Sequence, residues 1–256
     1  MKTTLGFIGG GRITKIFLRA FQNKSLEFGS ILVYEPNQEV ASALKAQFPD
    51  ITITDSQTGP ARQEILFLAI HPPIMTETLD SIKETVKAES TVVSLAPKIN
   101  MEKLAGLLNT RRIVRMIPNA TSFINKGYNP VSYHHSFPGE EKKNLMQLFK
   151  KLGKTMEVEE SMLEGYAIVS AMLPTCFWFQ WKKMEDLAQQ MGFGEEEARK
   201  VIRKTLERSV RLYFNSGLTP EEVMDLIPVK PIGEHEDQIR EILDTQLLGL
   251  YNKIKP

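Results

Sequence analysis

Short apolar runs rich in β-branched residues alternate with amphipathic segments over the first 160 residues of the chain. We expect strands in the apolar runs, at Thr4–Ile8, Ile31–Tyr34, Ile51–Ile53, Glu64–Ile70, Thr91–Leu95 and Arg112–Ile117. Helical periodicity lies between most of them, at Ile13–Asn23, Glu39–Phe48, Ile74–Val86 and Met101–Leu108. Such alternation of strand and helix predicts a parallel sheet with helices on both faces.

The pattern changes after two further strand-like runs, Asn129–His134 and Thr155–Val158, which flank a helical segment at Glu140–Leu152. Beyond Glu160 the periodicity is helical throughout, with a capping box at Thr219-Pro220-Glu221-Glu222 that starts a new helix. The predicted fold class is therefore α/β, with an N-terminal Rossmann-type parallel sheet followed by an all-helical dimerisation domain. We place the dinucleotide-binding domain at 1–158 and the helical substrate and dimerisation domain at 159–256.

The segment Tyr166–Trp181 is apolar around its whole circumference, so a helix there must be covered on all sides. About a hundred residues of helix are few for that task, and we expect a homodimer formed through the C-terminal helices. Packing against the first domain alone is the alternative. Polar residues and a proline interrupt the segment, which falls short of the roughly 20 apolar residues of a membrane span. We expect no membrane partner.

Composition and charge narrow the function classes. Charged residues make up 25% of the 256 residues and the net charge is +1, so no overall field would attract nucleic acid, and we expect no nucleic-acid partner. Cys176 is the only cysteine, which excludes an internal disulfide and fits a reducing compartment. It lies in an apolar run and is interpreted as a buried thiol. With no recognisable export signal, a cytoplasmic location is expected.

The first strand-like run leads into Gly9-Gly10-Gly11-Arg12-Ile13-Thr14. Gly9 allows a tight turn, and Gly11 lets a diphosphate approach the backbone amides at the start of the next helix. A glycine fingerprint alone is weak evidence, and the third position holds Thr14 instead of glycine or alanine. Its place between the first strand and the first helix strengthens the prediction of a dinucleotide site.

The second strand ends at Tyr34-Glu35, close to the spacing expected for a ribose-binding acid. Glu35 would accept hydrogen bonds from the ribose hydroxyls of the adenosine and would repel a 2′-phosphate. Pro36-Asn37-Gln38 follows and offers no arginine to offset that repulsion. The cofactor is therefore NAD or NADP, with Glu35 favouring NAD. A solvated carboxylate at a strand end is the alternative interpretation of Glu35.

Other ligand-side residues should follow the carboxyl ends of later strands, because ligands of open α/β sheets bind there. This rule points to Ala69-Ile70-His71-Pro72, Ser94-Leu95-Ala96-Pro97 and Met116-Ile117-Pro118-Asn119. We interpret His71 as a strand cap that contacts the cofactor through its backbone; acid–base catalysis by its ring is the alternative.

These segments resemble the pyrroline-5-carboxylate reductase family. The family is similar to this chain at Gly6–Gly11, at its Ala-Val-Lys-Pro element (here Ala69–Pro72), and at its Arg-x-Met-Pro-Asn-Thr-Pro signature (here Arg115–Thr121). Ser94-Leu95-Ala96 and Ser216-Gly217-x-x-Pro220 also fit. The resemblance covers nearly the full length.

The resemblance implies a Rossmann domain, a helical dimerising domain, and hydride transfer from NAD(P)H to the carbon of a C=N bond in a small cyclic imine, as in proline biosynthesis. Position by position, Gly9, Gly10, Gly11, Arg12 and Ile13 would hold the diphosphate and Glu35 the ribose. Ser56 would lie near the adenosine, and Ala69, Ile70, His71, Pro72 and Ala96 would line the nicotinamide side. Asn119 would lie closest to the reacting centre.

The departures from the family fall on the substrate side. The family's Ser-Gly-Ser-Gly-Pro-Ala-Tyr helix start stands here as Ser170–Cys176, with Met172 and Leu173 replacing small residues. Its Ser-Pro-Gly-Gly-Thr-Thr loop is replaced by Pro228–His235, so the donors that a substrate carboxylate would need are missing. The catalytic residues are therefore unknown, with Asn119, Ser170 and Thr175 as substrate-side candidates.

Two alternatives remain open, and a third lacks its signature. A reductase for a different small imine or keto substrate would share the scaffold. A non-catalytic dinucleotide-binding sensor would explain the eroded substrate motifs, because function lies in the site and not in the fold. A β-hydroxyacid dehydrogenase would need a lysine followed four residues on by an asparagine, which Lys182-Lys183-Met184-Glu185-Asp186 does not supply.

We predict no metal site. His134-His135 would point to opposite faces of a strand, which argues against joint ligation, and Glu234-His235-Glu236-Asp237 is interpreted as a solvated helix start.

Overall fold

The protein is described by a computed structural model covering residues 2–256, which form two compact units. The first, the sheet unit, runs to Ala171 and takes in the C-terminal Leu250–Pro256. The second, the helical unit, is Met172–Gly249. The expected boundary at 158 coincides with the end of the last strand, whereas the two units divide after Ala171.

The sheet unit is built on a single eight-stranded sheet of order β3-β2-β1-β4-β5-β6-β7-β8. The first six strands are parallel, as the alternating pattern predicts, and β1, β4, β5 and β6 are short and buried. The strands are β1 Thr4–Ile8, β2 Ser30–Tyr34, β3 Thr52–Thr54, β4 Ile65–Leu68, β5 Thr91–Ser94, β6 Ile113–Met116, β7 Gly127–Tyr133 and β8 Gly153–Glu157. This confirms a Rossmann-type sheet followed by helices.

The alternation of strand and helix predicted a parallel sheet, but the observed sheet is not parallel throughout. β7 pairs antiparallel with β6, with Arg115 opposite Ser132, and β8 then runs parallel to β7. The connection between β6 and β7 contains only the short helix η2 (Ala120–Ile124), which is too short for the crossover that a parallel pair needs. The antiparallel turn is therefore a consequence of the short connection.

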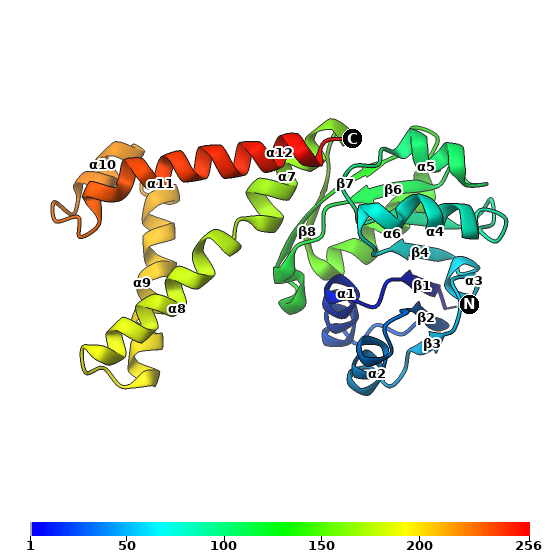
Figure 1. Ribbon diagram of the computed structural model, residues 1–256, viewed down its shortest axis with the longest axis horizontal. Coiled ribbons are helices and arrows are strands. Elements are labelled where there is room, and N and C mark those ends of the chain that lie inside the picture. The colour runs from blue at the N-terminus through cyan, green and yellow to red at the C-terminus, as the bar shows by residue number, and fades with distance from the viewer. Residues whose placement is uncertain (1) are drawn as a thin grey trace. The chain divides into compact units, whose positions relative to one another are not determined.

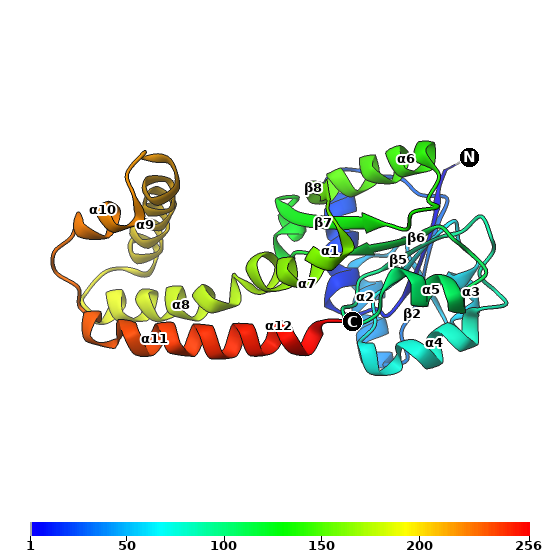
Figure 2. The ribbon, with the colours of Figure 1, turned by 90° about the horizontal axis from the view of Figure 1, so that it is seen from above.

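Helices cover both faces of the sheet because successive strand residues point to opposite sides. Phe7, Phe67 and Val93 face α1 (Arg12–Asn23), α2 (Gln38–Gln47) and α6 (Gly139–Phe149). Their neighbours Ile8, Leu66 and Val92 face α3 (Thr58–Ala61), α4 (Met75–Ile82) and α5 (Met101–Leu107). Figure 2 shows α6 and α4 on opposite sides of the sheet. Short 3-10 helices are η1 (Pro72–Ile74), η3 (Lys150–Leu152) and η4 (Glu160–Met162).

Helices continue after β8, and the chain is helical to its end (Figure 1). The remaining elements of the sheet unit begin with α7 (Leu163–Tyr166) and the π-helix η5 (Ala167–Met172). The helical unit contains α8 (Thr175–Gln190), α9 (Glu195–Asn215), α10 (Pro220–Asp225), η6 (Gly233–His235), α11 (Glu236–Leu243) and the π-helix η7 (Asp244–Leu248). The last helix is α12 (Gly249–Ile254). The capping box that starts α10 is present as predicted.

The helical unit has almost no apolar interior of its own. Within residues 172–249, all of which the structure describes, Ala198 is the only buried apolar residue. Large apolar side chains of α8 are exposed, including Phe179 at 68%. Cys176 is partly exposed, so the interpretation of a buried thiol is wrong for this chain. The helical run Glu160–Gln190 contains an 18-residue window with a mean hydropathy of 1.3, so by length and composition it could cross a membrane, which the count over Tyr166–Trp181 did not suggest.

Candidate functional site

The glycine turn after β1 is held in the conformation that a dinucleotide site requires. Gly9 has φ +100°, in the region that favours glycine, and a Cβ atom there would lie 2.4 Å from the carbonyl oxygen of Ala69. A Cβ on Gly11 would meet no atom within 4 Å, so the space over the start of α1 is open. The turn is therefore tight at its first glycine and leaves room for a ligand at its third.

Thr14, which departs from the usual fingerprint, has a local role in this turn. Its side chain is fully buried and its hydroxyl donates a 2.5 Å hydrogen bond to the carbonyl of Gly9. The threonine thus holds the positive-φ glycine that begins the turn. Its position on the inner face of α1 keeps the open N-terminal amides of the helix free for an anion.

Glu35 lies beside the glycine turn, at the end of β2. One carboxylate oxygen accepts the Gly10 N–H at 2.8 Å, and the other accepts the Asn37 N–H at 3.0 Å. These two bonds fix the carboxylate, and each oxygen retains a lone pair with which it could accept a ribose hydroxyl. Glu35 is thereby preorganised as the acid that the spacing from Gly9 predicted.

A pocket extends from the glycine turn across the carboxyl ends of β1, β2, β3 and β4. Among the predicted residues, those that line it are Gly9, Gly11, Glu35, Ser56, Ala69, Ile70 and His71. Gly10 is in reach through its bond to Glu35, and Arg12 and Pro72 adjoin lining residues in the chain. Ile13 is not among the lining residues and packs against the core cluster instead. Ala96 is 3% exposed, packs in the core cluster under α4 and α5, and is not brought to this pocket.

Two carboxylates of this pocket were not identified from the sequence. Asp55 follows β3 and Glu77 lies in the first turn of α4, and both line the pocket with Glu35. No lysine or arginine is among its lining residues. The rule that ligands bind at the carboxyl ends of strands, applied to β3, would have found Asp55. The pocket therefore has an acidic lining where the adenosine half of a dinucleotide would bind.

Asn119, the candidate nearest the reacting centre, is almost fully enclosed. Its Oδ1 accepts the Thr121 N–H at 2.9 Å and the Thr121 hydroxyl at 2.6 Å, and its Nδ2 donates to the carbonyl and hydroxyl oxygens of Ser170, both at 3.2 Å. The Ser170 hydroxyl in turn donates to the carbonyl of Tyr128. The structure thus joins two of the predicted substrate-side residues, with Asn119 tying the end of β6 to η5.

Thr175 belongs to the helical unit, where its hydroxyl donates to the carbonyl of Met172. This bond lies at the start of α8, following Pro174. Its observed contact is therefore local to the chain bend that precedes α8.

We expect the replacement Asn119→Asp to destabilise the sheet unit by about 2 kcal/mol, because a carboxylate oxygen would replace the amide donor beside the Ser170 carbonyl and leave a buried acceptor unsatisfied. The matched control is Asn109→Asp, since the Asn109 amide bonds the Lys83 carbonyl from an exposed position. Urea unfolding followed by circular dichroism gives both free energies. An equal loss in the two variants would contradict the role of the Asn119–Ser170 contact.

Taken together, a strand–glycine turn–helix, a fixed carboxylate at the end of β2 and a pocket over the strand ends are the features of a dinucleotide-binding site of the Rossmann type. Residues 4–98 match the family described as "NADP oxidoreductase coenzyme F420-dependent". The pyrroline-5-carboxylate reductase of Escherichia coli K12 is 26% identical over 89% of this chain and 85% of its own length.

Two solved structures show the same fold. A Plasmodium falciparum pyrroline carboxylate reductase with NADP bound has a TM-score of 0.78 at 18% identity, covering 98% of this chain and 95% of its own. The 1-pyrroline-5-carboxylate reductase of Streptococcus pyogenes has a TM-score of 0.79 at 15% identity, covering 99% and 98%. The chain is thus similar over most of its length to pyrroline-5-carboxylate reductases and is an NAD(P)-dependent oxidoreductase.

Proposed function

We propose that this protein uses NADH to reduce the C=N bond of a small cyclic imine in the cytoplasm. The observation that carries the proposal is the preorganised pocket at the glycine turn, with Gly9 at φ +100° and Glu35 held by the Gly10 amide. Similarity to pyrroline-5-carboxylate reductases over most of the chain supports the imine as the substrate class.

The residues present fit a dinucleotide, since the space beyond Gly11 is open and Glu35 has acceptor capacity to spare. When bound, a reduced nicotinamide supplies a hydride, which would pass to the imine carbon while the nitrogen keeps its proton and becomes an amine. A protonated imine is already electrophilic, so the protein's contribution would be proximity, orientation and exclusion of water. This accounts for a site without an evident strong general acid.

Turnover with a panel of substrates tests the proposal. Oxidation of NADH at 340 nm would be followed with pyrroline-5-carboxylate, with a cyclic imine that lacks the carboxylate, and with a keto acid. We expect turnover with at least one imine. Tight NADH binding without turnover on any of these compounds would favour the sensor, and turnover on the keto acid alone would replace the imine as substrate class.

The departures at Met172, Leu173 and Pro228–His235 make the carboxylate-free imine an informative member of that panel. Glycine and threonine donors that a substrate carboxylate would need are replaced there by bulky and proline-containing sequence. If these donors are dispensable, turnover of pyrroline-5-carboxylate should be similar to turnover of the carboxylate-free imine.

We further propose that NADH is preferred over NADPH. Glu35, Asp55 and Glu77 line the adenosine end of the pocket, with no lysine or arginine among its lining residues. A 2′-phosphate placed beside these carboxylates would be repelled, and nothing in the lining would compensate for the repulsion.

The replacement Glu35→Gln should shift this preference toward NADPH by at least about tenfold, or about 1.4 kcal/mol, because it removes the charge nearest the ribose. Calorimetric titration of both reduced cofactors gives the ratio of dissociation constants. Glu39→Gln is the matched control, since Glu39 is an exposed acid at the start of α2 that does not line the pocket. If the two variants give the same ratio, the proposed role of Glu35 in cofactor choice is wrong.

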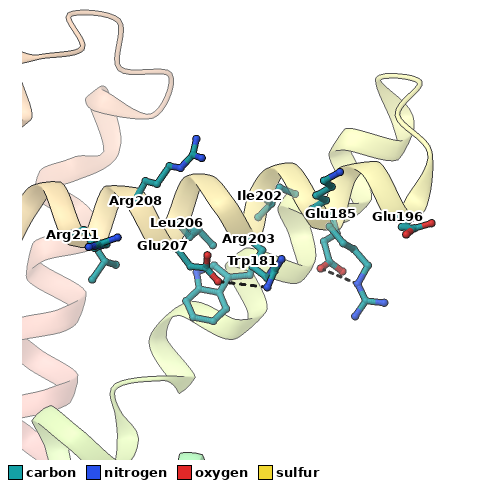
Figure 3. A pocket seen from close by; sticks show the side chains of 12 residues that line it. Trp181, Glu185, Glu196, Ile202, Arg203, Leu206, Glu207, Arg208 and Arg211 are labelled. Carbon is teal, nitrogen blue, oxygen red and sulfur yellow. Dashed lines mark ion pairs between the residues drawn. The ribbon is translucent and has the colours of Figure 1, made fainter. Parts of the chain in front are cut away.

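We also propose that the helical unit is completed by a second copy of the chain. A groove between α8 and α9 is lined by Trp181, Ile202, Leu206 and Val210, with charged residues around them (Figure 3). Arg199 pairs with Glu185 at 3.6 Å and Arg203 with Glu207 at 3.7 Å. Exposed apolar surface of this extent is unusual for a monomer and is typical of an interface.

Light scattering on the purified chain measures this directly. A homodimer has twice the 29.1 kDa of the chain. A monomer that remains in solution would refute the proposal. If the chain instead floats with lipid vesicles in a density gradient, the apolar run Glu160–Gln190 would be assigned to a membrane.

A further inference from the structure

A small cluster of potential metal ligands lies in the sheet unit, away from the dinucleotide pocket. It consists of Glu102 in the first turn of α5 and of His134 and His135, which directly follow β7. One ligand atom from each residue lies within 4.8 Å of the other two. The residues come from distant parts of the sequence, so the fold brings them together.

The sequence predicted that the two imidazoles point to opposite faces of a strand. In the structure they do not. β7 ends at Tyr133, so the alternation of a strand does not extend to the histidines. Their ring centroids are 4.2 Å apart with an interplanar angle of 36°, and both rings face Glu102. The physical argument against joint ligation therefore does not hold.

The two distances from the Glu102 carboxylate match those of a tetrahedral ligand set. Glu102 Oε1 lies 3.2 Å from His134 Nε2 and 3.4 Å from His135 Nδ1. Around zinc, with ligand distances of about 2.0–2.1 Å, two ligand atoms are about 3.3–3.4 Å apart. One ion could therefore contact all three side chains, with water completing the coordination.

His134 supplies an independent observation. Its side chain is 2% exposed, yet its Nε2 has no hydrogen-bond partner, because Glu102 Oε1 lies close by but away from the direction of an N–H bond. A buried polar nitrogen without a partner is costly and calls for an explanation. An ion lying between the ring and the carboxylate would satisfy this nitrogen.

The charges around the cluster also favour a cation. The pocket next to it contains Glu157, Glu159 and Glu160 besides Glu102, and no lysine or arginine is among its lining residues. Glu157 pairs with Lys142 and Glu160 with Arg115, so the negative charge that remains is that of Glu102 and Glu159.

We propose that Glu102, His134 and His135 bind a divalent transition-metal ion of the zinc type, which links the start of α5 to the end of β7. His134 Nδ1 accepts the Ser136 N–H at 3.3 Å, so the imidazole proton lies on Nε2 in the metal-free protein. Metal binding at Nε2 requires this proton to move to Nδ1, which then can no longer accept the Ser136 N–H, so the long contact is broken. This cost predicts an affinity weaker than that of structural zinc sites.

Calorimetric titration of the full untagged chain with zinc chloride tests the proposal. We expect one equivalent per chain, and a dissociation constant at least tenfold weaker in His135→Ala and in Glu102→Gln. These residues are exposed, so their replacement leaves the core intact. His235→Ala is the control, because His235 is also exposed beside a glutamate but lies in the helical unit. The zinc affinity of this variant should equal that of the parent chain.

A second measurement identifies the ligands. Cobalt(II) substituted for zinc should give visible absorption bands of a tetrahedral site, and these bands should be lost in His135→Ala. The proposal is overturned by the absence of saturable zinc binding, by binding that survives both ligand replacements, or by binding that only His235→Ala weakens. The result does not depend on the reductase activity, which is measured separately with NADH.

Discussion

Replacing Arg115 with methionine is expected to destabilise the protein by about 3–5 kcal/mol, because the replacement leaves a buried negative charge without its partner. Arg115 is 1% exposed on β6, and its guanidinium pairs with Glu164 at 2.5 Å and Glu160 at 3.0 Å. Glu164 is equally buried, at 2%. Glu160 also accepts the Met101 N–H at 2.8 Å, so the same carboxylates connect β6, α5 and the segment that follows β8.

The double variant Arg115→Met, Glu164→Gln should recover part of this loss, since it removes the stranded charge. Arg112→Met is the matched control, because Arg112 pairs with Glu141 at 2.9 Å while partly exposed, and exposed pairs contribute about 0–1 kcal/mol. Urea unfolding of the three variants gives the free energies. Equal effects for Arg115→Met and Arg112→Met would show that burial of the Arg115 cluster adds nothing to stability.

The Arg115 cluster also shows what a sequence can and cannot predict. Strands and helices follow from the spacing of apolar residues, and here all six leading strands and the helices α1, α2, α4 and α5 between them were predicted within a few residues. The four-residue helix α3 was not predicted. Arg115, however, lies in an apolar run, and its partners are 45 and 49 residues away in sequence. Glu160 and Glu164 stand four apart and share a helix face, but no local pattern assigns that face to β6.

The candidate site was predictable to a similar degree. Glycines at a strand end and an acid at the next strand end follow from local rules, and Gly9, Gly11 and Glu35 line one pocket. Asn119 was expected beside the reacting centre, but its amide is used by Thr121 and Ser170. The bonds of a buried amide depend on which segments meet in the fold, and the sequence gives no measure of that.

The two outer glycines of the turn should respond differently to replacement. Gly9→Ala is expected to lower stability by about 1–3 kcal/mol, because φ +100° is strained for alanine and its Cβ would lie 2.4 Å from the Ala69 carbonyl oxygen. Dinucleotide binding should be lost with the turn. This result alone would not separate a ligand site from a structural glycine.

Gly11→Val makes that separation. Gly11 has φ −72° and open space around its Cβ position, so valine should leave the unfolding free energy within about 0.5 kcal/mol of the parent. Its side chain would occupy the space into which a diphosphate must come to reach the amides of α1, and NADH affinity should fall by at least about a hundredfold, or about 2.7 kcal/mol.

Gly106→Val is the control for the glycine-to-valine change, since Gly106 lies on α5 with open space around its Cβ position. It should bind NADH like the parent chain. Calorimetry and urea unfolding on all three variants separate the two effects, because only Gly11→Val should lose binding while keeping its stability. If Gly11→Val bound NADH as tightly as the parent, the diphosphate would not approach the chain at this turn, and the pocket at the strand ends would have to hold something else.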